Sequence, residues 1–238
     1  MLVAAAVCPC PPLLVPEVAA GAAGELAEAR AACADAVAVL AAARPDRLIV
    51  VGTSEEPARG THPQGAPGSF RGFGVDLDVH LGPADPEAPA DRELPASLAV
   101  AAWLLERASW SAAPVTGIGV DERLPTERCV ETGRELAAQH ARVALLVMGD
   151  ASACRTLKAP GYFDERAEAF DAEAARALAA ADLAAVESLD AELAHQLKAA
   201  GRAPWQILAG AARETDLKGE LLYDQAPYGV GYLVAAWS

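Results

Sequence analysis

Residues 142–150 read RVALLVMGD, and this stretch determines the fold class that we expect. Val143–Met148 is entirely apolar, and Gly149 and Asp150, which follow it, favour a turn. A short uncharged run of this kind predicts a strand buried on both faces of a sheet. Ligands of open α/β sheets bind outside the carboxyl ends of such strands, so the turn at Asp150 is a candidate site.

Short apolar runs alternate with helical patterns on both sides of this strand. In residues 17–43, Cys33, Val37 and Leu40 recur at helical spacing on one face, which predicts a helix with Cys33 in the core. The other expected helices are 94–108, 126–140, 164–178, 190–200 and 204–213, and the other expected strands are 1–7, 47–52, 74–82, 114–120, 219–225 and 230–237. We therefore expect a single α/β domain over residues 1–238, with a central mixed sheet, helices on both faces and the last two strands paired.

Two segments look like functional loops. Residues 7–18 read VCPCPPLLVPEV, and the prolines, which cannot extend a sheet ladder, end the first strand in a stiff turn. Residues 52–74 are rich in Gly, Pro, Thr and Ser and have no apolar period, so we expect one long loop. Long loops in compact domains are more often functional or mobile than inert.

The composition excludes some classes of function. The formal net charge is -14 and no Lys/Arg cluster is present, so the attraction to phosphates that supports nucleic-acid binding is missing. No stretch approaches the roughly 20 apolar residues of a membrane span, and the secretory pattern is absent, so we expect a cytoplasmic protein without a membrane partner. Five cysteines suit reduced thiols in that compartment. The absence of Asn and scarcity of Lys are typical of a high-GC bacterial genome.

The loop after the central strand contains candidate catalytic residues. Asp150 and Ser152 follow the strand directly, and Cys154 comes next. The simpler interpretation is that Asp150 caps the next turn while Gly149 permits a tight bend. Near the end of the chain, glycines flank Val230 in APYGVGYLVAAW, which indicates close approach of a backbone or a ligand beside Tyr228.

Five separated segments, CPCPPLLVPEV, MGDAS, APGYFDERAEAFD, AGRAPWQILAGA and APYGVGYLVA, occur in the order and spacing of a known family. They resemble the class III extradiol ring-cleavage dioxygenases, the LigB-like family, and most closely its small branch related to the MEMO proteins. This resemblance implies the LigB-like α/β fold. It also implies a non-haem Fe(II) held by two His and one Glu, which binds a catechol and O₂, and a further His that acts as acid and base.

The positions that match these four groups have lost the expected side chains. The first His ligand falls on Cys10, and the second falls on Ser54 or Glu55. The acid/base His corresponds to Ala153, and the Glu ligand corresponds to Ala199. Because two imidazoles and a carboxylate hold Fe(II) in such oxygenases, we expect no iron binding in the family's manner and no ring cleavage.

A relocated metal site is an alternative. Cys8, Cys10 and His62 could ligate Zn or Cu(I), since thiolates favour soft metals, with Cys154 as a further candidate. We expect no cofactor, and the alternative is Fe(II) or Zn. The simpler interpretation is that Cys8 and Cys10 are small buried hydrophobic residues, as free cysteines usually are.

The leading prediction is a LigB-like protein with a degenerate iron site that binds a small molecule or a protein, with Asp150 and Ser152 as the candidate catalytic residues. The pocket is expected to involve Cys10, Pro11, Thr53, Ser54, Glu55, His62, Cys154 and Tyr228. The alternatives are a metal-dependent oxidoreductase with relocated ligands, a thiol enzyme that uses Cys10 with Asp150, and a non-catalytic subunit. A sizeable exposed apolar patch would favour the subunit, and homo-oligomerisation is left open.

Overall fold

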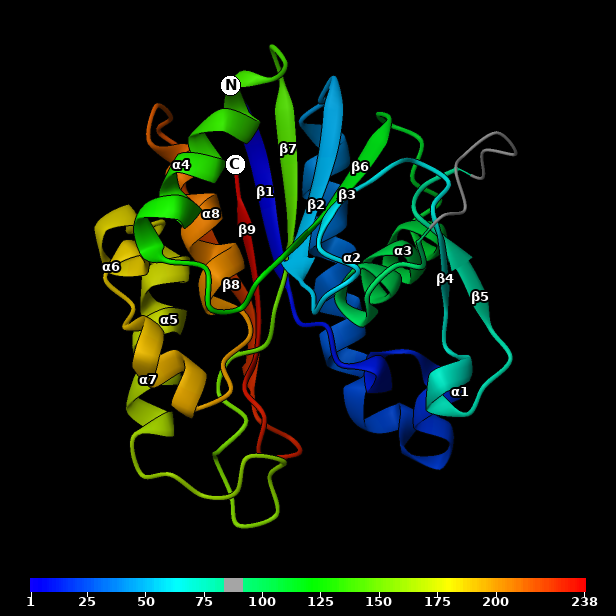
Figure 1. Ribbon diagram of the computed structural model, residues 1–238, viewed down its shortest axis with the longest axis vertical. Helices are drawn as coiled ribbons and strands as arrows, with labels where there is room; N and C mark the ends of the chain where they lie inside the picture. Colours follow the sequence, from blue (N-terminus) through cyan, green and yellow to red (C-terminus); the bar gives the residue numbers. More distant parts are fainter. Residues whose placement is uncertain (84–91) are drawn as a thin grey trace.

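A computed structural model describes residues 1–83 and 92–238 of the chain (Figure 1). Its centre is one seven-stranded sheet in the order β3-β6-β2-β7-β1-β9-β8. The strands of this sheet are β1 Leu2–Cys8, β2 Arg47–Thr53, β3 Gly60–His62, β6 Val115–Val120, β7 Val143–Met148, β8 Gly219–Gln225 and β9 Tyr232–Trp237. The expected mixed sheet is confirmed, because β6, β2, β7 and β1 run parallel while β3, β9 and β8 pair antiparallel.

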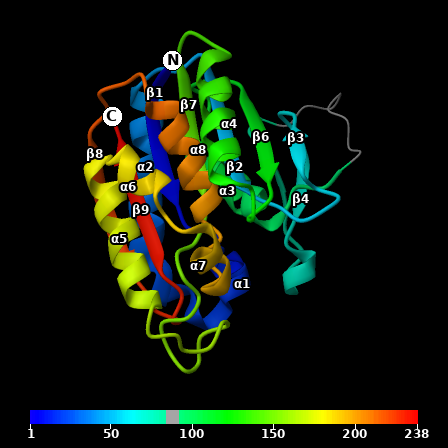
Figure 2. The same ribbon diagram turned by 60° about the vertical axis from the view of Figure 1, so that its left-hand side comes forward.

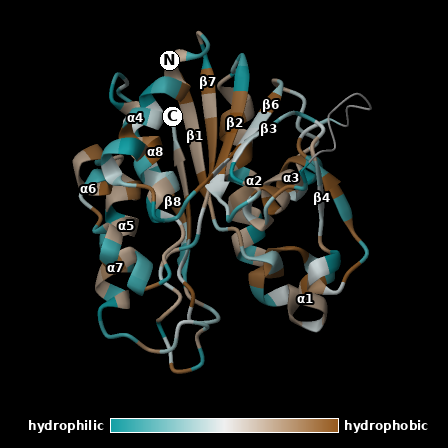
Figure 3. Cartoon of the chain, viewed as in Figure 1, coloured by the Kyte–Doolittle hydropathy of each residue, from teal (hydrophilic) through white to brown (hydrophobic). Residues whose placement is uncertain are grey.

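The central strand β7 forms as its sequence predicts. All its residues are buried, and they alternate between two cores: Leu146 and Met148 face one core while Leu145 and Val147 face the other. Figure 3 shows hydrophobic colours along the central strands, as expected for a sheet covered on both faces. β8 and β9 pair as neighbours, as predicted, and β9 also pairs with β1.

Helices cover both faces of the sheet (Figures 1 and 2). The helices are α1 Pro16–Ala19, α2 Ala27–Ala42, α3 Ala96–Arg107, α4 Thr126–Ala138, α5 Ala167–Ala180, α6 Leu183–Glu187, α7 Ala191–Gln196 and α8 Arg202–Ala212. Residues of α2 and α3 form one core, and residues of α4, α5 and α8 form the other. In the part of the chain that the structure describes, no helix is long and apolar enough to cross a membrane.

The expected helix over 17–43 is broken. The chain forms α1, then 3-10 turns over Ala20–Leu26, and only then α2. The break lies at Ala20, whose φ is 47°, and the 3-10 segment contains Gly21 and Gly24. Glycine lowers helix stability by about 1 kcal/mol relative to alanine, which the apolar spacing alone did not reveal. Cys33 is buried in the core on α2, as predicted.

Residues 52–74 are not one long loop, which corrects the prediction. They contain β3, the short strand β4 at Pro67–Ser69 and a 3-10 turn at Arg71–Phe73. The expected strand over 74–82 shrinks to β5 at Asp78–His80, which pairs with β4 outside the main sheet. A strand of three residues is too short to show an apolar period in the sequence. What stabilises β3 is its pairing with β6, which is distant in the chain.

Candidate functional site

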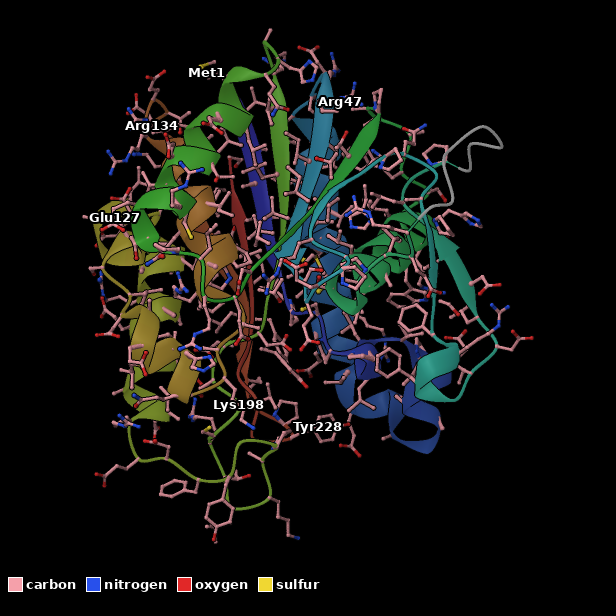
Figure 4. The ribbon with its side chains drawn as sticks, viewed as in Figure 1. Met1, Arg47, Glu127, Arg134, Lys198 and Tyr228 are labelled. Carbon is pink, nitrogen blue, oxygen red and sulfur yellow. The ribbon has the colours of Figure 1, made fainter. Side chains whose placement is uncertain are left out.

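The carboxyl ends of four parallel strands meet at one edge of the sheet. Successive strands along this edge send their chains to opposite sides: β1 and β2 lead to α2 and α3, whereas β6 and β7 lead to α4 and α5. Diverging loops of this kind open a crevice beyond the strand ends, where α/β proteins bind ligands. In Figure 4, Met1 and Arg47 mark the end of the sheet where β1 and β2 begin, and Tyr228 lies toward the opposite end.

A cavity of about 890 Å³ lies at this edge, within the range of small-molecule sites. Its walls come from the loops after β1, β2 and β6 and from the first turn of α3. The lining residues are Cys10, Thr53, Ser54, Glu55, Glu56, Ala58, Arg59, Pro95, Ala96, Ser97, Asp121, Glu122 and Arg123. Four predicted pocket residues, Cys10, Thr53, Ser54 and Glu55, are therefore brought together.

Three of the six charged side chains on the cavity wall are engaged with one another. Arg59 forms ion pairs with Asp121 at 2.9 Å and with Glu56 at 3.4 Å, and its Nε donates to the Ser54 carbonyl. Glu122 accepts a contact from His195 at 2.9 Å. The wall carries four carboxylates against the guanidinium groups of Arg59 and Arg123, so it has an acidic balance.

Asp150 is hydrogen-bonded to Cys10, which lines this wall. Its Oδ1 accepts from the backbone N–H of Cys10 at 2.8 Å, so it does not cap the next turn. Burial raises the pKa of Asp150 to about 7, and the Cys10 N–H lowers it only partly. Burial, and then the Asp150 charge, also raises the pKa of the Cys10 thiol well above its usual range. A carboxyl that titrates near neutrality is suited to exchange a proton with a ligand.

Ser152 has a different role from the one predicted. It is fully buried, and its N–H and Oγ both donate to the Asp171 carboxylate at 2.8 Å. Arg155 donates to the same carboxylate at 3.2 Å. Burial raises the pKa of Asp171, while Ser152 and Arg155 oppose that change. Ser152 therefore anchors the loop after β7 to α5 and does not line the cavity.

The other predicted pocket residues lie away from the cavity wall. His62 is buried on β3, and its Nε2 contacts the Ala58 carbonyl at 2.8 Å. The Cys154 thiol is buried and donates to the Leu197 carbonyl at 3.4 Å. Pro11 directly precedes the 3-10 turn at Pro12–Leu14, and Tyr228 packs beside the α2 and α3 core.

These side chains do not assemble a metal site. Among residues 1–83 and 92–238, no group of three His, Cys, Asp or Glu side chains is arranged to hold a metal ion. Cys8 is fully buried at the end of β1, whereas His62 lies on β3 at the far edge of the sheet. The relocated site of Cys8, Cys10 and His62 is therefore not formed.

The residues that match the iron ligands of the resembled family do not fit Fe(II). Ala199, at the position of the Glu ligand, has no donor atom, and neither has Ala153 at the acid/base position. Their methyl groups pack into different cores. Cys10 contributes a soft thiol with a raised pKa, where the family has an imidazole. Ser54 is buried, and its hydroxyl donates to the Glu55 carbonyl. No reaction step can be assigned to iron on this set of side chains.

Sequence reasoning missed nine of the thirteen residues that line the cavity. Arg59, Asp121, Arg123 and the first turn of α3 were not among the predicted residues. Asp121 directly follows a predicted strand, as Asp150 does, so the same rule of strand ends could have found it. The α3 residues carried no such signal, because only the tertiary fold brings that helix to the edge.

Comparison with known proteins supports the fold but no family. No family model and no curated protein matches the sequence. The structure is similar to the crystal structure of an uncharacterized protein, JW3007 from Escherichia coli K12, with a TM-score of 0.54 and 15% identity. The match covers 99% of this chain and 100% of that one. At this identity the likeness concerns the fold alone, so membership of the LigB-like or MEMO branch stays a prediction.

Proposed function

We propose that this protein binds a small polar organic molecule in the cavity at the carboxyl edge of the sheet, and that it does not cleave aromatic rings. The observation that carries this proposal is the cavity itself: about 890 Å³, with walls from three strand ends and one helix. Its polar side chains and short apolar ones, such as Ala58 and Ala96, suit a ligand with both kinds of surface.

The argument against ring cleavage rests on side chains. In the resembled family the iron needs two imidazoles and a carboxylate, and the matching positions here are Cys10, Ser54 or Glu55, and Ala199. Ala153 replaces the acid/base histidine, which removes a contribution of about 10²- to 10⁴-fold in rate. Binding of a ligand requires neither the iron ligands nor the acid/base histidine.

A ligand screen tests the binding proposal. Thermal unfolding is measured with amines, carboxylic acids, phenols and catechols, each added singly. At ten times Kd, a ligand adds about 1.4 kcal/mol of stability, which raises Tm by about 3–6 °C in a protein of this size. We expect at least one class to produce this shift.

A matched pair of variants locates the binding. Ala96 is exposed at the start of α3 and lines the cavity, so Ala96→Trp fills the site without entering the core. Ala34 is exposed on α2 outside the cavity wall, and Ala34→Trp is the control. The Tm shift should vanish in the first variant and persist in the second. A screen without any shift, or an equal shift in both variants, would contradict the proposal.

A separate experiment tests the loss of ring cleavage. The protein is purified without chelator or nickel, its metal content is measured, and catechol oxidation is assayed after anaerobic reconstitution with Fe(II). We expect no stoichiometric iron and no turnover. Stoichiometric iron with ring cleavage would show that the lost ligands have been replaced by others.

A thiol enzyme is less well supported. A nucleophilic cysteine needs a lowered pKa, usually from an adjacent base or cation. Burial and the neighbouring Asp150 charge act on Cys10 in the opposite direction. In the described residues the Cys10 thiol has no histidine partner. The cavity therefore favours binding over nucleophilic catalysis.

A second candidate, a subunit that binds another protein, is favoured by one exposed apolar loop. Leu157, Tyr162 and Phe163, in the connection after β7, are 65%, 65% and 52% exposed. Exposed large apolar side chains grouped in this way often mark protein contacts. Sedimentation of the wild type and of a variant with all three residues replaced by Ser would test whether this loop makes protein contacts, since a self-association that the replacement abolishes would place a contact between copies of this chain at the loop.

A further inference from the structure

The position of Asp150 follows from the strand register. Met148 of β7 lies opposite Cys8 of β1 and opposite Gly52 of β2. Asp150, Cys10 and Ser54 each follow two residues later, just beyond the strand ends, and Cys10 and Ser54 line the cavity. The hydrogen bond from the Cys10 N–H holds Oδ1 in place. Asp150 thus lies at the strand end between two parts of the cavity wall.

The Asp150 carboxyl has no cationic neighbour in residues 1–83 and 92–238, since none of the ion pairs found there involves it. The titratable groups that interact with its charge are the thiols of Cys10, just after β1, and Cys33 on α2, and the phenol of Tyr232 on β9, and the pKa of each is raised. Cys8 lies next to Cys10 and Cys33. The Asp150 charge helps to raise the pKa values of Cys10, Cys33 and Tyr232, which confirms their proximity.

The cavity wall does not supply the missing cation. Arg59 is engaged with Asp121, Glu56 and the Ser54 carbonyl. Arg123 is exposed at the rim. Glu55, also on the wall, forms no ion pair within the described residues and adds negative potential. The wall therefore offers no cationic partner to Asp150, which is hydrogen-bonded to the lining residue Cys10.

We propose that the ligand of this cavity carries a protonated amino group and that the Asp150 carboxylate pairs with it. This inference rests on the proposed small-molecule function and specifies the chemical class of the ligand. A carboxylate that is partly removed from water and unpaired is unfavourable, and an ammonium group compensates it directly with a charge-assisted hydrogen bond. Cys10 is the positioning residue, because its N–H holds one oxygen of the Asp150 carboxylate in place.

The pairing predicts a definite pH dependence. The raised pKa of Asp150, about 7, means that the carboxyl is largely neutral at pH 5.5 and ionised at pH 8. An alkyl ammonium, like that of lysine, keeps its proton to about pH 10. Affinity for an amine should therefore rise as the pH passes through 7, and binding should release a proton near neutrality.

Benzylamine and benzyl alcohol form a matched pair of probes, because they have nearly the same shape and only the amine is charged. Binding is followed by amide chemical-shift changes in two-dimensional NMR at pH 8 and pH 5.5. We expect benzylamine to bind in the about millimolar range usual for so small a ligand, and to shift the amides of Cys10 and Ser54. Its affinity should be at least about fivefold higher at pH 8 than at pH 5.5, since ionised Asp150 is the partner.

Two variants complete the test. Asp150→Asn keeps the acceptor for the Cys10 N–H but removes the charge, so benzylamine binding should weaken at least about fivefold and lose its pH dependence. Asp35→Asn, on an exposed position of α2, should change neither. Equal binding of both probes, unchanged in Asp150→Asn, would overturn the inference while leaving the proposed function intact. Failure of benzylamine to bind at about 10 mM would also overturn it, and the ligand screen would then judge the proposed function separately.

Discussion

Asp150 should destabilise the folded protein at neutral and alkaline pH, and Asp150→Asn should relieve that effect. Folding raises the pKa of this carboxyl from 3.8 to about 7. The folded state therefore binds more protons than the unfolded state between these values. Stability contributed by Asp150 is present below pH 3.8 and falls as the pH rises through 7.

The magnitude follows from the same two values. One pKa unit corresponds to about 1.4 kcal/mol, so the difference between 3.8 and about 7 amounts to at most about 4 kcal/mol above pH 8. This free energy is an upper limit because Asp150 keeps some solvent exposure, which weakens the effect of burial. Asn retains an oxygen for the Cys10 N–H, so the substitution removes the charge and little else.

Urea unfolding of both proteins at pH 4.5, 6, 7 and 8.5 measures the effect. With a slope of about 3 kcal/mol per M, the variant midpoint should exceed that of the wild type by up to about 1.3 M at pH 8.5. The two midpoints should converge toward pH 4.5. Asp35→Asn, at an exposed position, should follow the wild type within about 0.5 kcal/mol throughout. If Asp150→Asn is no more stable than the wild type at pH 8.5, the carboxylate is compensated and the reasoning fails.

Three further predictions concern other parts of the molecule. Gly210→Ala would place a Cβ 2.3 Å from the Val130 carbonyl where α4 and α8 touch, and should lower the unfolding free energy by about 3 kcal/mol in a urea titration. Ser152→Ala should cost about 1–2 kcal/mol through the lost bond to Asp171, yet leave ligand-induced Tm shifts unchanged; a lost shift would place Ser152 in the site. Cys10 should react with iodoacetamide at pH 8 at least about tenfold more slowly than glutathione, as followed by mass spectrometry, because its pKa is raised; faster reaction would support a thiol enzyme.

Part of the site could be located from the sequence, but its chemistry could not. The rule that ligands bind beyond strand ends selected Asp150, and the family resemblance pointed to Cys10; both lie at the same edge of the sheet. The same rule placed Ser152 in the site, although the next turn carries it into a buried bond with Asp171. A side chain four residues beyond a strand has left the regular alternation, so its direction depends on the loop and not on the pattern.

The sequence by itself determined the sheet and its cover, since Val143–Met148 and the other apolar strands can be buried only between two layers of helices. At the positions that match the acid/base His and the Glu ligand of the resembled family, the sequence has Ala153 and Ala199, neither of which carries a donor atom. Only the tertiary structure decided that Asp150 has a pKa near 7 and that α3 closes the cavity beside Cys10. A carboxyl pKa depends on what surrounds the charge in space, and those neighbours come from strands and helices that are distant in the chain.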